Sequence, residues 1–302
     1  MPAVSEVSLN RKNIFILPTG PGLLFLTATS LIFITAINYV LSLAFGLAFL
    51  MTSLFILCIL HTFRNLQHLR IRGAGAEPVF AGEEAAFVFV LQRNASQSHE
   101  MLELRFANGN WSYADLFDKE QERVKVYLPT KQRGVLRAPR VTVQTRFPLG
   151  LWRAWSYVDL DMEVVVYPKP LPGPMPNSTG GSSSGETSKV QAGVEDFHGL
   201  RNYSAGDSPK QIAWKNLARG QGLKVKQFVE AQDEHLLLDW AQFVGLDPEQ
   251  RLSRLCYCVL DLTHRDVDFA MRLPGVEIAL GKGDAHCKKA LRALALWNTE
   301  GA

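Results

Sequence analysis

One long apolar stretch constrains this chain more than any other feature of its sequence. From Ile14 to Phe63 the only Lys, Arg, Asp, Glu or His is His61. The stretch is about twice as long as the roughly 20 residues that one helix needs to cross a bilayer. We therefore predict that the chain crosses a membrane twice.

A polar amide and an amphipathic ring, Asn38 and Tyr39, interrupt this stretch near its middle. Side chains of this kind are typical of the membrane interface, so we place a tight turn there. A cleaved signal peptide is disfavoured, because its apolar region is only about 7–15 residues long. The prediction is a transmembrane hairpin over 18–63, with helices near 18–37 and 41–62, preceded by a cytoplasmic N-terminus over 1–17.

The basic residues next to the hairpin predict its orientation. Arg11 and Lys12 precede the first helix, Arg64, Arg70 and Arg72 follow the second, and the turn between the helices has no Lys or Arg. Such residues are retained on the cytoplasmic side. We expect both termini and all soluble parts on the cytoplasmic side of a bacterial inner membrane, with membrane lipid around the hairpin.

After the hairpin the apolar residues alternate with polar ones. Short β-rich runs such as AAFVFVLQR, MLELRFA and RVKVYLP follow one another between turn-prone residues. This spacing is typical of an antiparallel sandwich, and we predict an immunoglobulin-like β-sandwich over 69–170. We interpret the aromatic residues of TRFPLGLWRAW (145–155) as packing. The Pro-, Gly- and Ser-rich residues 171–192 then form a flexible linker.

The remaining residues, 193–302, alternate between predicted strands and helices. HLLLDW, VDFAMRL and VEIALG are expected strands, and DPEQRLSRLCYCVLDLTHR is an expected helix with Pro248 in its first turn. Another helix is expected from Asp284 to about Trp297. This order predicts a C-terminal α/β domain. The chain is thus predicted to be a multidomain membrane protein.

The segment GLRNYSAGDSPKQIAWKNLARG (199–220) mixes glycines, aromatics and charges of both signs. Gly206 is suited to positive φ, Asp207 to capping the next backbone groups, and Pro209 to the first turn of a short helix that Trp214 anchors. Two interpretations stay open: a structural latch of ion pairs and hydrogen bonds, or a partner-binding surface. The residues concerned are Arg201, Tyr203, Asp207, Lys210, Trp214, Lys215 and Arg219.

The same segment resembles the signature of the domain of unknown function 58 family. The matching residues are Phe197, Gly199, Leu200, Arg201, Tyr203, Gly206, Asp207, Lys210, Ile212, Trp214, Ala218 and Arg219. Lys210 stands where that family usually has Arg, so a bidentate contact at this position is in doubt. The resemblance implies that the α/β domain is a truncated von Willebrand factor A-like domain. It also implies a MoxR-type AAA+ ATPase and a transglutaminase-like membrane protein as partners.

A von Willebrand factor A domain holds a metal with an Asp and two hydroxyl side chains after its first strand. The corresponding residues here are Asp239, Ala241 and Phe243, so Asp239 is only a remnant of such a site. Hard cations require several oxygen ligands. We expect no metal and no cofactor.

Three function classes follow from these patterns. We favour a membrane-tethered cytoplasmic scaffold or interaction protein, an accessory to a MoxR-type ATPase in protein maturation or envelope processes. The alternative is an enzyme that acts on an anionic substrate through the basic residues of the signature, although no catalytic group was identified. Nucleic-acid binding is disfavoured because the basic residues are few. The cysteines, Cys58, Cys256, Cys258 and Cys287, lack metal-site spacing and are expected to be reduced.

Overall fold

The computed structural model describes residues 6–94, 97–107, 109–175, 196–202, 224–229 and 236–298, with only the backbone of the fourth and fifth ranges. The chain divides into two compact units. The first comprises Met1–Gly173, Leu246–Tyr257 and Lys288–Ala302, and the second comprises Pro174–Gly245 and Cys258–Cys287.

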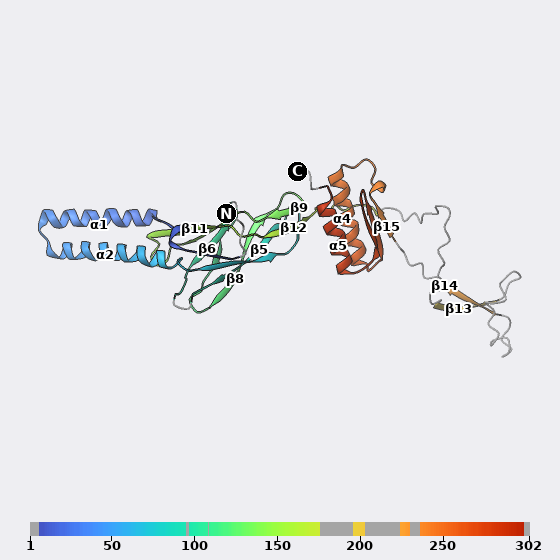
Figure 1. Ribbon diagram of the computed structural model, residues 1–302, viewed down its shortest axis with the longest axis horizontal. Coiled ribbons are helices and arrows are strands. Elements are labelled where there is room, and N and C mark those ends of the chain that lie inside the picture. The colour runs from blue at the N-terminus through green and yellow to red at the C-terminus, as the bar shows by residue number, and fades with distance from the viewer. Residues whose placement is uncertain are drawn as a thin grey trace. The chain divides into compact units, whose positions relative to one another are not determined.

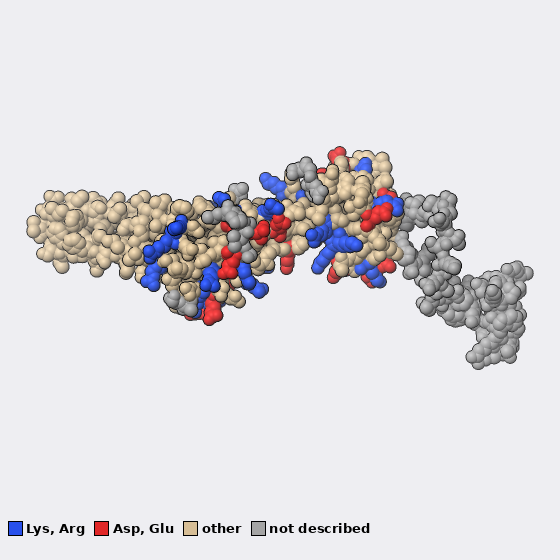
Figure 2. Space-filling model, viewed as in Figure 1, with Lys and Arg blue, Asp and Glu red and all other residues tan. Residues whose placement is uncertain are grey.

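The apolar stretch forms two helices, α1 (Gly20–Tyr39) and α2 (Ser42–Arg64), which lie side by side (Figure 1). Val40 adopts the left-handed conformation in the turn between them. Both helices are long and apolar enough to cross a membrane, and each begins and ends within two residues of its predicted bounds. Figure 2 shows the visible face of this pair without Lys, Arg, Asp or Glu.

Small and aromatic side chains pack the two helices together. Ala36 and Ala48 are almost completely buried, which allows the backbones to approach each other. The rings of Phe25 and Phe55 stack with their centroids 6.0 Å apart. Leucines elsewhere point outward, and Leu43 is 91% exposed. A helix pair that is apolar all round is suited to a lipid environment.

Three β-sheets belong to the same unit. The four-stranded sheet has the order β1 (Glu6–Ser8), β3 (Arg70–Ala76), β5 (Glu84–Gln92) and β8 (Gln121–Pro129). The five-stranded sheet has the order β2 (Phe15–Pro18), β11 (Trp152–Val158), β10 (Val141–Thr145), β6 (Leu102–Phe106) and β7 (Ser112–Ala114). The three-stranded sheet has the order β4 (Val79–Phe80), β12 (Glu163–Tyr167) and β9 (Gly134–Arg137). The β-rich runs recognised in the sequence all correspond to strands of these sheets.

The residues before α1 also contribute strands, which the sequence pattern did not predict. β1 pairs antiparallel with β3, and β2 pairs antiparallel with β11. Between them, the backbone amide of Leu9 donates to the carbonyl of Leu69 at 2.9 Å. The β region that we placed over 69–170 therefore lacks two of the strands seen in the structure.

One hydrophobic core joins these sheets. Phe87 and Phe89 of β5 contact Phe106 of β6, with ring centroids 5.5 and 6.0 Å apart. Val166 of β12 and Leu9 belong to the same cluster and are fully buried. Burial of each such side chain contributes about 1.5–3 kcal/mol. The segment before α1 is therefore part of the core.

The C-terminal residues form an α/β region, as predicted. β15 (Leu236–Asp239) pairs parallel with β16 (Phe269–Leu273), which pairs antiparallel with β17 (Val276–Gly281). The helices are α4 (Pro248–His264) and α5 (Asp284–Leu296), with a short 3-10 helix, η3 (Trp240–Gln242), after β15. A separate hairpin pairs β13 (Asp196–Asn202) with β14 (Lys224–Val229).

All four cysteines lie in the described part of the chain. Each is buried, and none takes part in a disulfide bond. Their reduced state stays an expectation from the spacing in the sequence.

We predict that Leu9→Ala destabilises the full-length protein by about 2–5 kcal/mol, because Leu9 is fully buried in the shared core. Chemical denaturation in detergent, followed by tryptophan fluorescence, measures this free energy. Leu17→Ala is the matched control, since Leu17 is 58% exposed in β2. Equal stability of the two variants would show that the segment before α1 does not belong to the core.

Candidate functional site

The structure describes little of the signature that we singled out in the sequence. Arg201 lies in β13, where its backbone is paired with that of Val225 in β14. The other residues of the predicted latch or partner surface lie outside the described residues: Tyr203, Asp207, Lys210, Trp214, Lys215 and Arg219. Their contacts stay predictions.

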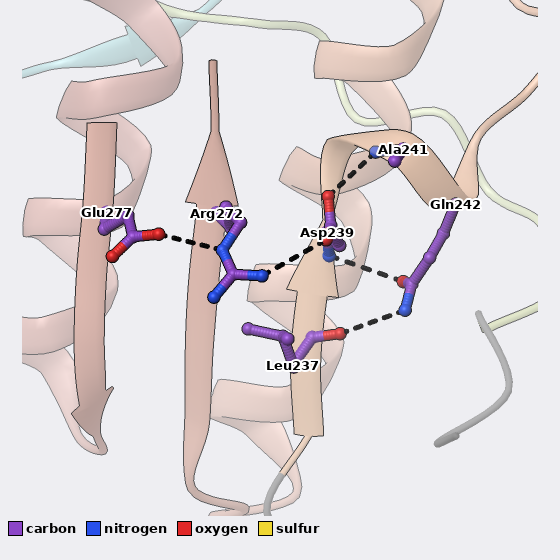
Figure 3. A network of polar contacts seen from close by, with 6 residues as sticks. All are labelled: Leu237, Asp239, Ala241, Gln242, Arg272 and Glu277. Carbon is purple, nitrogen blue, oxygen red and sulfur yellow. Dashed lines mark hydrogen bonds and ion pairs between the residues drawn. The ribbon is translucent and has the colours of Figure 1, made fainter. Parts of the chain in front are cut away.

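Asp239 lies at the end of β15, where the metal remnant was expected (Figure 3). Its Oδ1 accepts a hydrogen bond from the backbone amide of Ala241 at 2.9 Å, which caps η3. Its Oδ2 lies 3.8 Å from Nη1 of Arg272 in β16. Arg272 is also paired with Glu277 of β17 at 2.9 Å. The carboxylate of Asp239 therefore joins the ends of neighbouring strands.

This network is unsuited to a metal cation, because the positively charged guanidinium of Arg272 already lies beside the Asp239 carboxylate. Ala241 and Phe243 supply no side-chain oxygen. Among the residues that the structure describes, no group of three His, Cys, Asp or Glu side chains is placed to hold a metal ion. Asp239 thus has a structural role in a capping and ion-pair network.

A second group of polar contacts lies where the helix pair meets the sheets. At the start of α1, the backbone amide of Thr19 donates to the carbonyl of Leu151 at 2.9 Å. The hydroxyl of Thr19 accepts from the amide of Gly22 at 3.1 Å and so caps the helix. A Cβ at Gly22 would overlap the carbonyl oxygen of Leu151, so only glycine permits this approach.

Helix α2 makes two further contacts with the segment before and within β11. The indole of Trp152 packs on Phe55 with centroids 4.8 Å apart and donates to the carbonyl of Phe55 at 3.1 Å. The hydroxyl of Thr62 donates to the carbonyl of Phe147 at 2.7 Å. The contact of the Trp152 ring agrees with the interpretation of this aromatic residue as a packing residue.

Asn65, which caps the end of α2, makes the densest set of contacts at this junction. Its side-chain amide donates to the carbonyl of Glu100 and to the hydroxyl of Thr145, both at 2.7 Å. Its side-chain oxygen accepts from the amide of Glu100 at 2.8 Å. Asn65 as a whole is only 5% exposed, so removing these bonds would leave buried polar groups unsatisfied. Asn65 therefore fixes the end of α2 to the sheets.

His99 completes this set from the loop before β6. The ring is fully buried, and Nδ1 donates to the backbone carbonyl of Asn65 at 2.7 Å. Burial lowers the pKa of His99, the hydrogen bond to Asn65 partly opposes this change, and the positive charges of Arg93 and His68 reinforce it. His99 is therefore neutral at neutral pH, with its proton on Nδ1, because a carbonyl can only accept.

Beside these contacts lies a cavity of about 570 Å³, which we call the junction cavity. This volume falls within the range of about 300–1,000 Å³ that is typical of small-molecule sites. One part of its wall is apolar and comes from the last turns of α2 and the loop before β11. The other part is polar. The apolar residues include Leu54, Leu57, Phe147 and Leu149, and the polar ones include His61, Arg64, Gln97, Ser98 and Glu100.

The two charged residues of the junction cavity are opposite in sign but do not pair. No ion pair within 4.0 Å joins Arg64 to Glu100, and neither has another ion-pair partner among the described residues. The Glu100 carboxylate has one side-chain contact, a 3.5 Å hydrogen bond from Ser98. The amide oxygen of Gln97 is buried and has no hydrogen-bond partner in the described part of the chain. The cavity thus offers a cation and an anion, and the buried Gln97 oxygen beside it is an acceptor without a partner among the described residues.

Sequence reasoning did not identify this cavity. In the sequence, Arg64 was used only as a basic residue that predicts the orientation of the hairpin. Glu100 belongs to no motif that we recognised. The two are 36 positions apart, and only the docking of α2 on the sheets brings them to one cavity. No local motif marks them.

Comparisons of the chain with family models, with curated proteins and with solved structures give no match. The resemblance of the segment from Phe197 to Arg219 to a family signature therefore stays an expectation from the sequence.

We predict that acid destabilises the junction through His99. The pKa of His99 is lower in the folded protein than its ordinary value of 6.5, so the unfolded chain takes up a proton first as the pH falls. The free energy of unfolding therefore keeps its full value above pH 6.5 and decreases as the pH drops below it. Melting temperatures in detergent between pH 8 and pH 5 measure this dependence. His99→Gln removes the titrating group and should flatten the acid slope.

His264→Gln is the matched control, because His264 is an exposed histidine at the end of α4 and should keep the slope of the parent protein. An unchanged acid slope in His99→Gln would contradict a coupling between His99 protonation and unfolding.

Proposed function

We propose that this protein is a membrane-anchored scaffold or interaction protein, with α1 and α2 as a transmembrane hairpin. The support is the length and uncharged composition of both helices. The start of α1 and the end of α2 lie at the end of the hairpin away from the Val40 turn. The start of α1 follows β2, which pairs with β11, and the end of α2 is bonded through Asn65 to Thr145. The sheets therefore lie on one side of the proposed membrane.

The observation that carries this proposal is the rigid attachment of the hairpin to the sheets. A flexible tether needs only an unstructured linker between anchor and domain. Here Asn65 ends α2 in a buried hydrogen-bond network, and Thr19 begins α1 on the carbonyl of Leu151. Such contacts hold the β region at a defined angle and distance from the bilayer, which is the property that a scaffold requires.

We extend the proposal to the folds of the soluble parts. The shared core of the four- and five-stranded sheets supports an immunoglobulin-like β-sandwich. The parallel pair of β15 and β16, connected through α4, supports a truncated von Willebrand factor A-like domain. The use of Asp239 in an internal network supports a degenerate form without a metal.

The proposed partner follows from the family resemblance. It is a MoxR-type AAA+ ATPase on the cytoplasmic side of a bacterial inner membrane, with a transglutaminase-like membrane protein in the same system. In this proposal Arg201, Asp207 and Trp214 stabilise the signature, whereas Lys210 and Lys215 face an acidic partner together with Arg219. The protein then acts as an accessory in protein maturation or envelope processes.

The first test concerns topology. Alkaline phosphatase fused after residue 302 should be inactive, because the C-terminus is cytoplasmic in this proposal, whereas a fusion after Val40 should be active. Activity of the fusion at residue 302 would contradict the proposed orientation. Loss of the protein from membranes on alkaline washing would contradict the transmembrane anchor itself.

The second test concerns the partner. Lys210→Ala/Lys215→Ala should weaken capture of a co-expressed MoxR-type ATPase about three- to tenfold, since each exposed charge pair contributes up to about 1 kcal/mol. Rising salt should reduce the difference from the parent protein. Lys288→Ala/Lys289→Ala, two exposed lysines of α5, removes the same charge and should keep full capture. Equal capture by all three proteins would contradict the proposed surface.

A further inference from the structure

The junction cavity combines two opposite charges with an apolar lining. Arg64 and Glu100 line the same space without pairing, so its formal charges sum to zero while remaining separated. Other residues that line this space, Leu54, Leu57 and Leu149, are apolar. Its best-matched ligand therefore carries one cation, one anion and an apolar chain.

The position of the cavity along α2 sets the shape of this ligand. Leu54 precedes Arg64 by ten positions, which corresponds to about 15 Å along a helix. That distance is half of the roughly 30 Å hydrocarbon core of a bilayer. The polar wall lies at the end of α2, and the apolar wall extends from it toward the middle of the hairpin.

A second groove continues this apolar wall. It has a volume of about 370 Å³ and is lined along α2 by residues such as Phe49, Ile56 and Leu60. Leu57 lines both the groove and the junction cavity. An extended apolar chain that begins beside Arg64 can follow this face of α2 without leaving it.

We propose that the junction cavity binds a phospholipid with an ethanolamine headgroup, an inference that rests on the proposed membrane anchoring. Arg64 pairs with the phosphate, and His61 contacts the same group. Glu100 pairs with the primary ammonium, and the amide of Gln97 rotates to accept from it. One acyl chain lies along Leu57 and continues over the groove on α2.

The charges of the cavity select this headgroup over others. An anionic headgroup without an ammonium leaves Glu100 facing a negative charge. A choline headgroup has no N–H to donate to Glu100 or Gln97, and its recognition relies on aromatic cages. Among the described residues that line the cavity, Phe147 is the one Phe, Tyr or Trp, so the lining supplies no cage of such rings. Ethanolamine satisfies both the cation and the anion.

The test uses the full-length protein purified in detergent and incubated with an equimolar mixture of phospholipids. The lipids share the same acyl chains and carry ethanolamine, choline or glycerol headgroups. Native mass spectrometry should show the ethanolamine lipid retained in preference to the other two. Glu100→Gln should lower the preference for ethanolamine over glycerol about tenfold, because a charge-assisted hydrogen bond is lost. Arg64→Gln should lower retention of every headgroup.

The matched controls are Glu84→Gln in β5 and Arg123→Gln in β8, which remove exposed charges from strands of the four-stranded sheet and should keep the parent preference. Glu100→Gln preserves the backbone contacts of residue 100 with Asn65, so the fold is retained. A Leu57→Trp variant, which fills the apolar wall, should reduce retention of all the lipids and leave the melting temperature of lipid-free protein within a few degrees.

Two outcomes overturn the lipid site: equal retention of the three lipids by the parent protein, or an unchanged preference in Glu100→Gln. Reconstitution into ethanolamine-lipid nanodiscs separates this failure from failure of the anchor. Protein that enters nanodiscs without headgroup preference contradicts only the lipid site. Protein that does not enter them contradicts the membrane anchor and, with it, the lipid site.

Discussion

The side chain of Asn65 joins the helix pair to the β-sheets, and the geometry of the first unit depends on this connection. Its amide nitrogen and oxygen bond to the backbone of Glu100 and to Thr145, while its own carbonyl accepts from His99. Asn65, His99 and Thr145 are buried, and a buried donor or acceptor left unpaired costs about 1–3 kcal/mol. A rotation of α2 relative to the sheets would break several of these bonds together.

This connection also determines what the junction cavity contains. Arg64 comes from the end of α2, and Glu100 comes from the loop that Asn65 holds. Neither charge has an ion-pair partner within the described part of the chain, so each can pair with a charged group of a ligand. The same contacts that fix the helix therefore hold two opposite charges beside an apolar wall, which is the arrangement that a zwitterionic lipid headgroup matches.

The sequence predicted elements where a single pattern extends over many residues. The helices were predicted because about 40 residues without a charge have few alternatives to membrane-spanning helices. β5 was predicted because its nine residues are rich in Val and Phe and continue over the length of a strand. β1 and β2, with three and four residues, are too short for such a pattern, and β2 reads as the beginning of the apolar stretch. Their pairing with β3 and β11 depends on residues far along the chain.

The same contrast applies to the sites. The resemblance to a von Willebrand factor A domain singled out Asp239, and the sequence alone shows that Ala241 and Phe243 have no side-chain oxygen. No local sequence pattern could predict that Arg64 and Glu100 line the same cavity. They come together only when the end of α2 docks against the loop before β6. Properties that depend on local composition, such as the length of the apolar helices, follow from the order of residues. Where two distant charges meet depends on buried hydrogen bonds such as those of Asn65, and only the tertiary structure forms them.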